Sequence, residues 1–454
     1  MIYINKCISN SICHRLSTGL VALLMAAVPA FGQATAPLSL DEVVGLVKEN
    51  ASVLRQARLQ VSRAGEQVAA ARTKTQPQIG TYLLGTRSFE APEIFVERGM
   101  LGELPKLGAF PPNAVTFSES RRNSLYSLIT LTYPLTGQRD IRTGIRMRET
   151  SRDIIEVRTM QATLDVVCEA KKLYCSVLAL ENARIANESA VRLFETYVST
   201  IERLVIEGYA QNADLLDVKA RLGQVRARDE ALRLKRASLL ETLGRLCGLD
   251  ASGSLALEPL PEPQEGPAFG AEKVHASVAG HPILREGTLR KRLAELDREL
   301  AKGEFRPGVA LTADRLQGHR TAEYLPKQVS AAGLLVSWNP FDWGKRRREL
   351  KEKQMACLQA EIALEDADRA VRETIRAADR RLRDAQAQLE AARKKEEWAG
   401  EQARVFRNRL AEKAILPKDL LEAEAELAEA RFQRHQACLD VWIAEAELEK
   451  AVGE

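Results

Sequence analysis

The sequence predicts a mainly helical protein with transmembrane β-strands, built from two tandem structural repeats. Three observations support this fold class. Only 5% of the 454 residues are aromatic and 28% are charged, which is typical of long solvated helices. Segments of the first half recur in the second half. Each copy also places two strand-like segments ahead of a helical stretch of 70 residues.

Composition and motifs exclude several function classes. The formal net charge of +4 is small, and acidic and basic residues alternate along the helices, so we expect no nucleic-acid partner. The sequence contains no phosphate-binding loop, no dinucleotide glycine signature and no nucleophile elbow. We therefore expect neither an enzyme nor a cofactor.

The cysteines lie in helical pattern and are expected to be structural thiols. Those that follow the N-terminal segment are Cys168, Cys175, Cys247, Cys357 and Cys438. Cys168 and Cys175 are separated by roughly 10 Å along one helix, too far for a disulfide. His435 and Cys438 could supply two metal ligands, but a structural site usually needs four, so we expect no metal.

The N-terminus has the features of a cleaved secretory signal. Basic residues precede the apolar run "LVALLMAAV", and small residues near Gly32 suit a signal peptidase. The run is too short to span a bilayer as a permanent helix. We assign residues 1–32 to a signal peptide.

Three landmarks reveal the internal duplication. The segment from Glu42 to Leu54 resembles the segment that begins 230 residues later. "LTYPLTGQRDIR" resembles "VSWNPFDWGKRR", with Pro134 matching Pro340 at an offset of 206. "EGYAQNADLLDVKARL" resembles "EKAILPKDLLEAEAEL" at an offset of 205. The chain is therefore expected to be two copies of one unit.

The copies have recognisable ends. Gly248 matches Gly453 at the offset of 205, which places a helix end in each copy. A proline-rich segment separates the copies and reads as a connector. We assign residues 33–256 to the first repeat, 257–268 to the connector and 269–454 to the second repeat.

Punctuation residues define the elements of the first repeat in order. Ser39 and Glu42 form a capping box, which predicts a single helix to about Gln76. The strand-like "QIGTYLLGT" follows Pro77. Residues 87–123 contain four prolines and are expected to be irregular. Residues 125–133 then alternate, with Leu, Ile and Tyr side chains on one face and threonines on the other.

The second repeat has the same elements, with Phe305, Val309 and Leu311 on one face of its first strand. Its long helix is expected over residues 344–413, matching 138–207 in the first repeat. At about 1.5 Å per residue each long helix would reach roughly 105 Å. The short helices are expected over about residues 40–76 and 213–247 in the first repeat, and over about 271–303 and 418–451 in the second. Their summed length in each repeat nearly equals that of the long helix, so two short helices stacked end to end would match the long helix beside them.

The four strands of about ten residues are long enough to cross a bilayer as β-structure. Four strands cannot close a barrel, and an open edge in lipid would leave unpaired backbone groups that cost several kcal/mol each. We therefore expect several copies of the chain to assemble.

The duplication, the junction "NPFDWGKRR" and the tip "EGYAQNADLLDVKARL" together resemble the TolC-like outer membrane efflux proteins across essentially the whole mature chain. The resemblance implies a homotrimer with a twelve-stranded β-barrel, four strands per chain, in the outer membrane of a Gram-negative bacterium. It also implies a long periplasmic α-helical barrel that serves as the exit duct of a tripartite efflux pump or a type I secretion system.

The implied partners are outer membrane lipid, a periplasmic adaptor protein and an inner-membrane transporter of the RND, ABC or MFS type. A periplasmic adaptor or a coiled-coil scaffold is the alternative. An adaptor carries one helical hairpin between β-domains, and a scaffold needs no paired strands.

The strand-to-helix junctions are expected to mark the membrane boundary. Proline cannot donate to a sheet ladder, whereas a helix in water satisfies its own backbone, so the break belongs where lipid ends. Aromatic residues here suit a membrane-interface girdle, although packing between helices is the alternative. The candidate junction residues are Tyr133, Pro134, Trp338, Pro340, Phe341 and Trp343. The basic residues 345–348 could contact lipid phosphates or acidic neighbours, or be solvated.

The far helix turns are expected at Gly208, Tyr209, Leu416 and Pro417. Acidic pairs follow each turn at helical spacing, namely Asp214 with Asp217 and Asp419 with Glu422. Carboxylates in a first helical turn are favoured by the helix dipole alone. In the family that the sequence resembles, these tips converge on the trimer axis, where acidic rings confer cation preference. We expect Asp419 and Glu422 to line the tunnel entrance, with Asp214 and Asp217 nearer the contact between hairpins.

Overall fold

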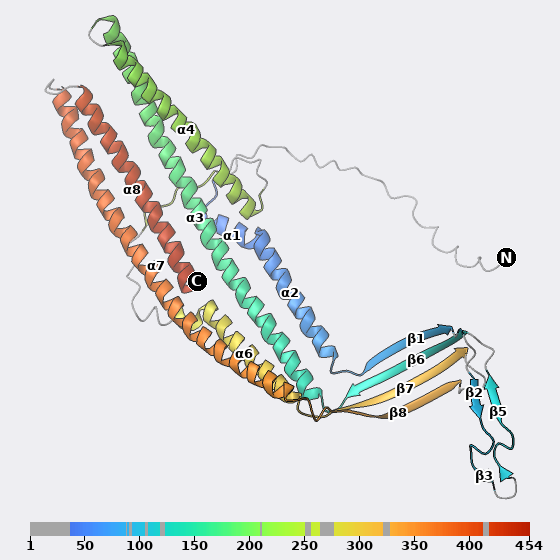
Figure 1. The fold of residues 1–454 in the computed structure, drawn as a ribbon. Coiled ribbons are helices and arrows are strands. Elements are labelled where there is room, and N and C mark those ends of the chain that lie inside the picture. The colour runs from blue at the N-terminus through green and yellow to red at the C-terminus, as the bar shows by residue number, and fades with distance from the viewer. Residues whose placement is uncertain are drawn as a thin grey trace, which may run out of the picture.

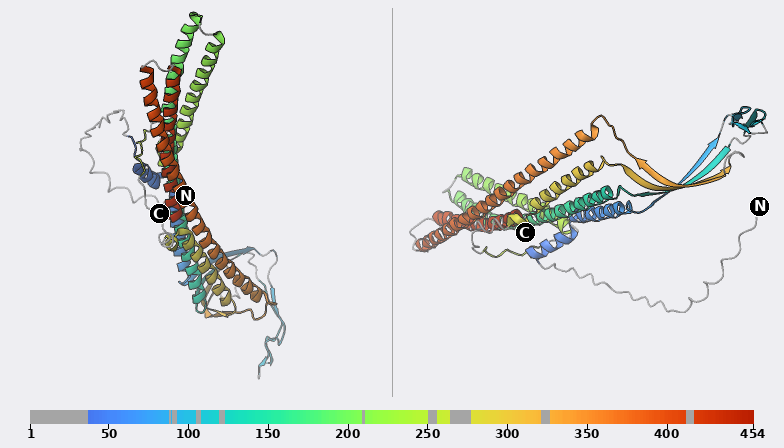
Figure 2. Two further views of the ribbon diagram at one scale, coloured as in Figure 1. Left: turned by 90° about the vertical axis from the view of Figure 1, so that its left-hand side faces the viewer. Right: turned by 90° about the horizontal axis from the view of Figure 1, so that it is seen from below.

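The computed structural model describes residues 37–87, 89, 93–104, 108–118, 123–208, 211–249, 256–263, 277–320, 327–411 and 417–454. The expected signal peptide, Tyr209 and Leu416 lie outside these residues. Figure 1 shows a long helical bundle, a four-stranded sheet at one end and a thin ribbon beyond the sheet. Figure 2 shows the sheet continuing away from the helical hairpin tips.

Both repeats contain the elements that the sequence predicts. The first has α1 (Leu40–Asn50), α2 (Ser52–Thr73), β1 (Gln78–Arg87), β6 (Asn123–Pro134), α3 (Gln138–Ile206) and α4 (Asn212–Cys247). The second has α6 (Pro282–Gly303), β7 (Gly308–Arg320), β8 (Gln328–Ser337), α7 (Lys345–Ala411) and α8 (Pro417–Val452). The fold class is therefore confirmed at the level of the single chain.

The predicted single helix from residue 40 to 76 is wrong, because the chain leaves helical geometry at Ala51. The capping box at Ser39 and Glu42 is present and starts α1. Ala51 then adopts φ −55° and ψ 123°, which separates α1 from α2. Because of this break, Ala51 and Leu54 lie in the same buried cluster as Val47. Tertiary packing therefore overrides local helix propensity at this position.

The equivalent break occurs in the second repeat, where one helix over residues 271–303 was predicted. His281 adopts φ −62° and ψ 131°, and Pro282 begins α6. Proline disfavours helical geometry at the residue before it and lacks the N–H that would continue the helix. His281 accepts a hydrogen bond at Nδ1 from the Ile283 backbone N–H, at 3.2 Å, and so caps α6.

Two long helices set the height of the bundle. α3 has 69 residues and α7 has 67, so each is roughly 100 Å long at about 1.5 Å per residue. α4 forms a hairpin with the half of α3 that is farther from the sheet, and α8 does the same with α7 (Figure 1). α2 and α6 lie beside the halves of the long helices that are nearer the sheet. α3 contacts α2 and α6, and α6 contacts α7, which gives a helix layer in the order α2, α3, α6, α7.

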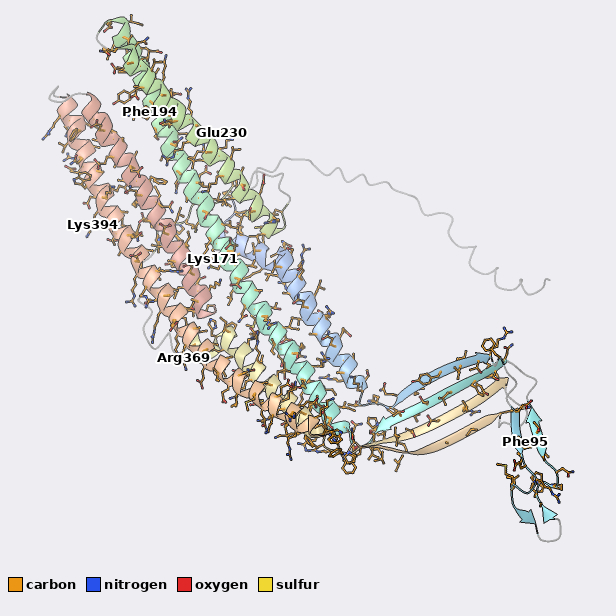
Figure 3. All side chains as sticks on the ribbon, viewed as in Figure 1. Phe95, Lys171, Phe194, Glu230, Arg369 and Lys394 are labelled. Carbon is orange, nitrogen blue, oxygen red and sulfur yellow. The ribbon has the colours of Figure 1, made fainter. Side chains whose placement is uncertain are left out.

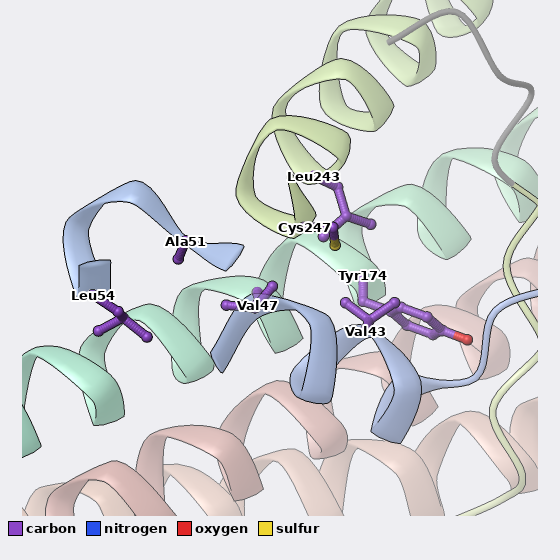
Figure 4. Packing of buried hydrophobic residues seen from close by; sticks show 8 residues of the cluster. Val43, Val47, Ala51, Leu54, Tyr174, Leu243 and Cys247 are labelled. Carbon is purple, nitrogen blue, oxygen red and sulfur yellow. The ribbon is translucent and has the colours of Figure 1, made fainter. Parts of the chain in front are cut away.

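A buried cluster joins the helices of the first repeat at the level of the break (Figure 4). Val43, Val47 and Leu54 pack with Tyr174 of α3 and Leu243 of α4. The Tyr174 hydroxyl lies 3.0 Å from the Leu38 carbonyl oxygen and 2.6 Å from that of Glu258. Burial raises the pKa of Tyr174 to about 12, so the hydroxyl stays protonated and ties the N-terminal segment to the connector.

Ion pairs join the two repeats where α3 lies against α8. Lys172 pairs with Glu447 at 2.6 Å, and Lys171, labelled in Figure 3, pairs with Glu449. Lys450 pairs with Asp165 of α3 at 2.6 Å. Burial alone would raise the pKa of Glu447, but hydrogen bonds from Lys172 and Arg381 outweigh burial and lower it.

The sheet is antiparallel, with the strand order β1, β6, β7, β8. The two repeats therefore meet at the central pair β6 and β7. Pro134 opposes Ala310 at one end of this pair, and Leu125 opposes Arg320 at the other. β1 and β8 form the two edges of the sheet.

The prediction that residues 87–123 are irregular is wrong in part. β2 (Glu93–Val96) pairs with β5 (Val115–Ser118), and β3 (Glu103–Leu104) pairs with β4 (Gly108–Ala109). These strands form the ribbon beyond the sheet, which carries Phe95 (Figure 3). "EIFV" and "VTFS" are proline-free and rich in β-branched and aromatic residues, so they can pair between the prolines.

Across the described ranges, no helix combines the length and apolar character that a membrane-spanning helix requires.

Candidate functional site

The half of the sheet nearest the helices has one apolar face. Cross-strand neighbours share a face, and the register places Tyr133 opposite Leu311 and Leu311 opposite Leu334. Val309 opposes Val336 on this same face. The other face carries threonines and Asp314, which opposes Thr130. The sheet therefore has the two-sided character of a wall between lipid and water.

The edge strands of this wall leave hydrogen-bonding groups unused. In the described part of the chain, no strand pairs with the outer side of β1 or β8. Exposed apolar side chains lie along both edges, including Ile79 at 74% exposure and Leu334 at 65%. An edge of this kind can persist in lipid only if another strand pairs with it.

The helix layer has an apolar edge on the same side as β8. Met355, Leu358 and Ile362 are exposed on α7 at helical spacing. The opposite edge is α2, on which Leu59 is exposed. The sheet and the helix layer thus both end in exposed apolar side chains.

The second strand-to-helix junction is fixed by one ion pair that the sequence pattern did not single out. The Asp342 carboxylate accepts hydrogen bonds from the backbone N–H groups of Gly344 and Arg346, at 3.0 and 3.1 Å. It also accepts one from Nε of Arg346 at 2.6 Å. The hydrogen bond from Arg346 is the main reason that the pKa of Asp342 is lowered. Acidic residues near a helix N-terminus, as in "FDWG", are the signal that could have identified Asp342.

Arg346 reaches back across the junction. Its guanidinium donates to the Glu304 carbonyl at 2.8 Å and to the Asn339 carbonyl. The same group lies 5.5 Å from the centre of the Phe305 ring. Arg346 therefore has a structural role, which separates it from the rest of the basic cluster.

The aromatic residues of this junction point into solvent in the single chain. Trp343 is 88% exposed, and its ring packs edge-on against Phe341 with centroids 4.8 Å apart. Trp338 is also exposed. Trp343 has φ 56°, a left-handed geometry that costs a non-glycine residue roughly 1–2 kcal/mol. Observed strain of this kind marks a candidate functional position.

The first junction is built differently because it lies inside the sheet. Tyr133 and Pro134 are half-buried at the end of β6, beside β7. Thr136, which the sequence pattern did not indicate, accepts a hydrogen bond from the Val309 N–H at 2.7 Å and lies 3.1 Å from the Pro307 carbonyl oxygen. Only the second junction, with Pro340, lies at a sheet edge.

The acidic candidates at the tips have local partners. Asp214 accepts a hydrogen bond from the Gln211 backbone N–H at 3.1 Å, and Asp217 pairs with Arg221 at 3.0 Å. Gly208 turns the chain after α3 with φ 81°. These contacts fit the helix-start explanation of the first pair. Pro417 begins α8 and Asp419 lies in its first turn, but their side chains are outside the described part, and Glu422 is exposed.

The thiols lie in the helix packing, and the candidate metal ligands lie beside a cavity. Cys168, Cys175 and Cys247 are buried among helices, and burial raises the pKa of Cys175 to about 12. Cys438 and His435 line a cavity of about 510 Å³ between α3, α8 and the connector. No group of three potential His, Cys, Asp or Glu ligands occurs within the ranges that the structure covers.

Comparisons with known proteins agree with this geometry. The family model described as "Outer membrane efflux protein" matches residues 43–249 and 274–454. No curated protein matches the sequence.

Several solved structures share the fold. A membrane protein from Pseudomonas aeruginosa is 17% identical, with a TM-score of 0.73 over 91% of this chain and 93% of its own. The outer membrane protein VceC from Vibrio cholerae is 14% identical, with a TM-score of 0.71 over 91% of this chain and 96% of its own. The CmeC outer membrane channel of Campylobacter jejuni is 14% identical, with a TM-score of 0.74 over 91% and 85%.

Proposed function

This chain belongs to the outer membrane efflux protein family, and from that premise we propose that three copies close one duct through the outer membrane and the periplasm. A periplasmic adaptor and an inner-membrane transporter of the RND, ABC or MFS type load this duct. The family is a class of efflux proteins and not of enzymes. The duct itself conducts passively and turns over no substrate.

One observation carries the proposal: the four-stranded wall has an apolar face, and no described strand pairs with either of its edges. Closing the edges with further copies removes the unpaired backbone groups, and three copies supply the strands of a small barrel. The helix layer ends at the same two sides, so one rotation closes both parts. The repeats described above and the connector 257–268 would then alternate around the axis.

Mass measurement of the purified protein in detergent tests the assembly. We expect the mass of three chains, and conductance when the protein is added to planar bilayers. A stable monomer that resists heat as a closed barrel does would refute closure between copies. Preparations that stay soluble and monodisperse without detergent would instead favour the adaptor or scaffold alternative.

The tips are proposed to carry the ion preference of the duct. Asp419 and Glu422 would form acidic rings at the periplasmic entrance, with Asp214 and Asp217 near the contact between hairpins. We expect Asp419→Ala with Glu422→Ala to reduce cation selectivity and divalent block in bilayers while assembly is unchanged. Asp214→Ala with Asp217→Ala is the matched pair. If the wild type and the first double variant had equal cation selectivity, the only remaining role for Asp419 and Glu422 would be to stabilise the start of α8.

A further inference from the structure

The basic cluster after the second junction contains two side chains with no protein partner in the described chain. Lys345 pairs with Glu349 at 3.7 Å, and Arg346 pairs with Asp342. Arg347 and Arg348 are exposed, and no ion pair or hydrogen bond joins the side chain of either to another described residue. These two guanidinium groups are therefore available to a ligand.

Their placement is unfavourable without an anion. α7 has no acidic residue in its first turn, and positive charge there opposes the helix dipole. Arg346 is compensated by Asp342, whereas Arg347 and Arg348 are not. Both lie on the side of α7 turned away from α6, because Arg346 and Lys353 make the contacts to the segment 297–305.

The second copy at this edge adds little negative charge. In the closed assembly β8 would pair with β1 of the next copy, which brings the C-terminal end of that copy's α2 beside the start of α7. Lys74 there is exposed and has no ion pair in the described chain, and Arg72 is already paired with Glu149. The exposed acids nearby are Glu304, whose carbonyl contacts Arg346, Glu352 on α7 and, about two turns before Lys74, Glu66 on α2. The joint therefore gathers unpaired basic groups at the level of the junction.

The aromatic residues place this joint at the membrane surface. Trp343 and Phe341 are exposed immediately before the basic cluster, and tryptophan prefers the interface between head groups and hydrocarbon. Basic residues on the water side of such aromatic groups lie at the height of the lipid phosphates. The fixed turn at Asp342 holds both groups in this order.

We propose that Arg347 and Arg348, with Lys74 of the next copy, bind the phosphate of an anionic phospholipid of the inner leaflet, whose acyl chains lie against Phe341 and Trp343. This site rests on the proposed closed assembly, because one side of it belongs to a second copy. The ligand is a phospholipid and not free phosphate, since the basic groups are continuous with an apolar surface that free phosphate would not cover.

Native mass spectrometry of the delipidated assembly tests the proposal, with phosphatidylglycerol and phosphatidylethanolamine offered in equal amounts. A basic residue near an anionic lipid surface contributes roughly a factor of five to binding. We therefore expect Arg347→Gln with Arg348→Gln to lower phosphatidylglycerol retention by roughly 30-fold, toward the level of phosphatidylethanolamine. Arg228→Gln with Lys394→Gln removes two exposed charges far from the junction and should leave retention unchanged.

The mass of the protein alone is read in the same spectrum, which separates this proposal from the proposed function. An assembly of three chains that retains both lipids equally, or whose double variant keeps the preference, overturns the lipid site alone. Competition by millimolar inorganic phosphate that removes phosphatidylglycerol completely would show that the site takes free phosphate. A chain that remains monomeric overturns both proposals.

Discussion

Two glycines at equivalent helix ends offer a sharp test of how the short helices stack. Gly248 follows α4 and Gly453 follows α8, with φ values of 70° and 88°. A Cβ atom on Gly248 would lie 2.7 Å from Cβ of Asn50, and one on Gly453 would lie 2.9 Å from Cδ of Pro282. Neither contact atom is the end of a flexible side chain. Alanine would therefore strain the backbone and force the neighbouring helix apart.

The expected cost follows from these two effects. Left-handed geometry costs a non-glycine residue about 1–2 kcal/mol, and overpacking costs about 1–3 kcal/mol. Gly248→Ala should thus destabilise the joint by about 2–5 kcal/mol. Gly223→Ala is the matched control, because Gly223 lies inside α4 and a Cβ atom there would meet no atom within 4 Å. Alanine at this position should stabilise the helix by roughly 0.5–1 kcal/mol.

Hydrogen exchange of the α1 amides reads the opening of this joint directly. Since about 1.4 kcal/mol is a factor of ten, Gly248→Ala should accelerate exchange at least ~30-fold, with the stacked second repeat unaffected. Gly453→Ala should act in the same way on α6 and spare α1. The reasoning fails if exchange in α1 is unchanged in Gly248→Ala, or if Gly223→Ala accelerates it equally.

Two further predictions concern the buried polar side chains of the same joints. Tyr174→Phe should cost roughly 0.5–1.5 kcal/mol, because it removes the hydroxyl that lies within hydrogen-bond distance of the Leu38 and Glu258 carbonyls. Faster proteolysis of the connector would show this cost, and unchanged proteolysis would contradict it. Burial lowers the pKa of His281 below its ordinary value of 6.5, although its hydrogen bond to the Ala451 backbone works against burial. The folded state therefore favours the neutral ring, so its contribution to stability is present above pH 6.5 and is lost as pH falls below that value. Melting temperature measured from about pH 5 to 8 should decline on acidification in the wild type and less in His281→Asn, which retains a capping side chain; parallel curves would refute this role.

The ends of the long helices could be predicted because proline and glycine residues next to them in the sequence mark where each helix begins and ends. Pro134 and Gly137 precede α3, and Gly208 follows it, so its predicted and observed ends agree within one residue. The break at His281 was also readable, since Pro282 follows it. Ala51 has no such neighbour, and only contacts with α3, distant in sequence, explain its geometry.

The sequence predicted where the second strand-to-helix junction lies, but not which contacts hold it in place. Pro340 and the aromatic residues identify where the strand ends. The roles within the basic run could not be separated, because the partners of Arg346 are Asp342 and the Glu304 carbonyl, and the latter lies 42 residues away in sequence. Pairing across such a separation depends on the packing of α6 against α7.

The central strand pair has a consequence for the contact between copies. β6 and β7 join one repeat to the next within the chain. In the proposed assembly the seam between chains would repeat the same operation, which would give approximate sixfold symmetry. Gln78 opposes Thr132 and Gly308 opposes Ser337, so the first strands of the two repeats are related by an offset of 230 and the second strands by an offset of 205. Thr130 opposes Asp314 in the internal seam, so Leu335 should oppose Leu84 of the next copy in the external one. Cysteines at those two positions should cross-link neighbouring chains, whereas cysteines shifted by one residue would point to opposite faces and should not. The β6–β7 pairing within one chain thus predicts how β8 of one copy pairs with β1 of the next.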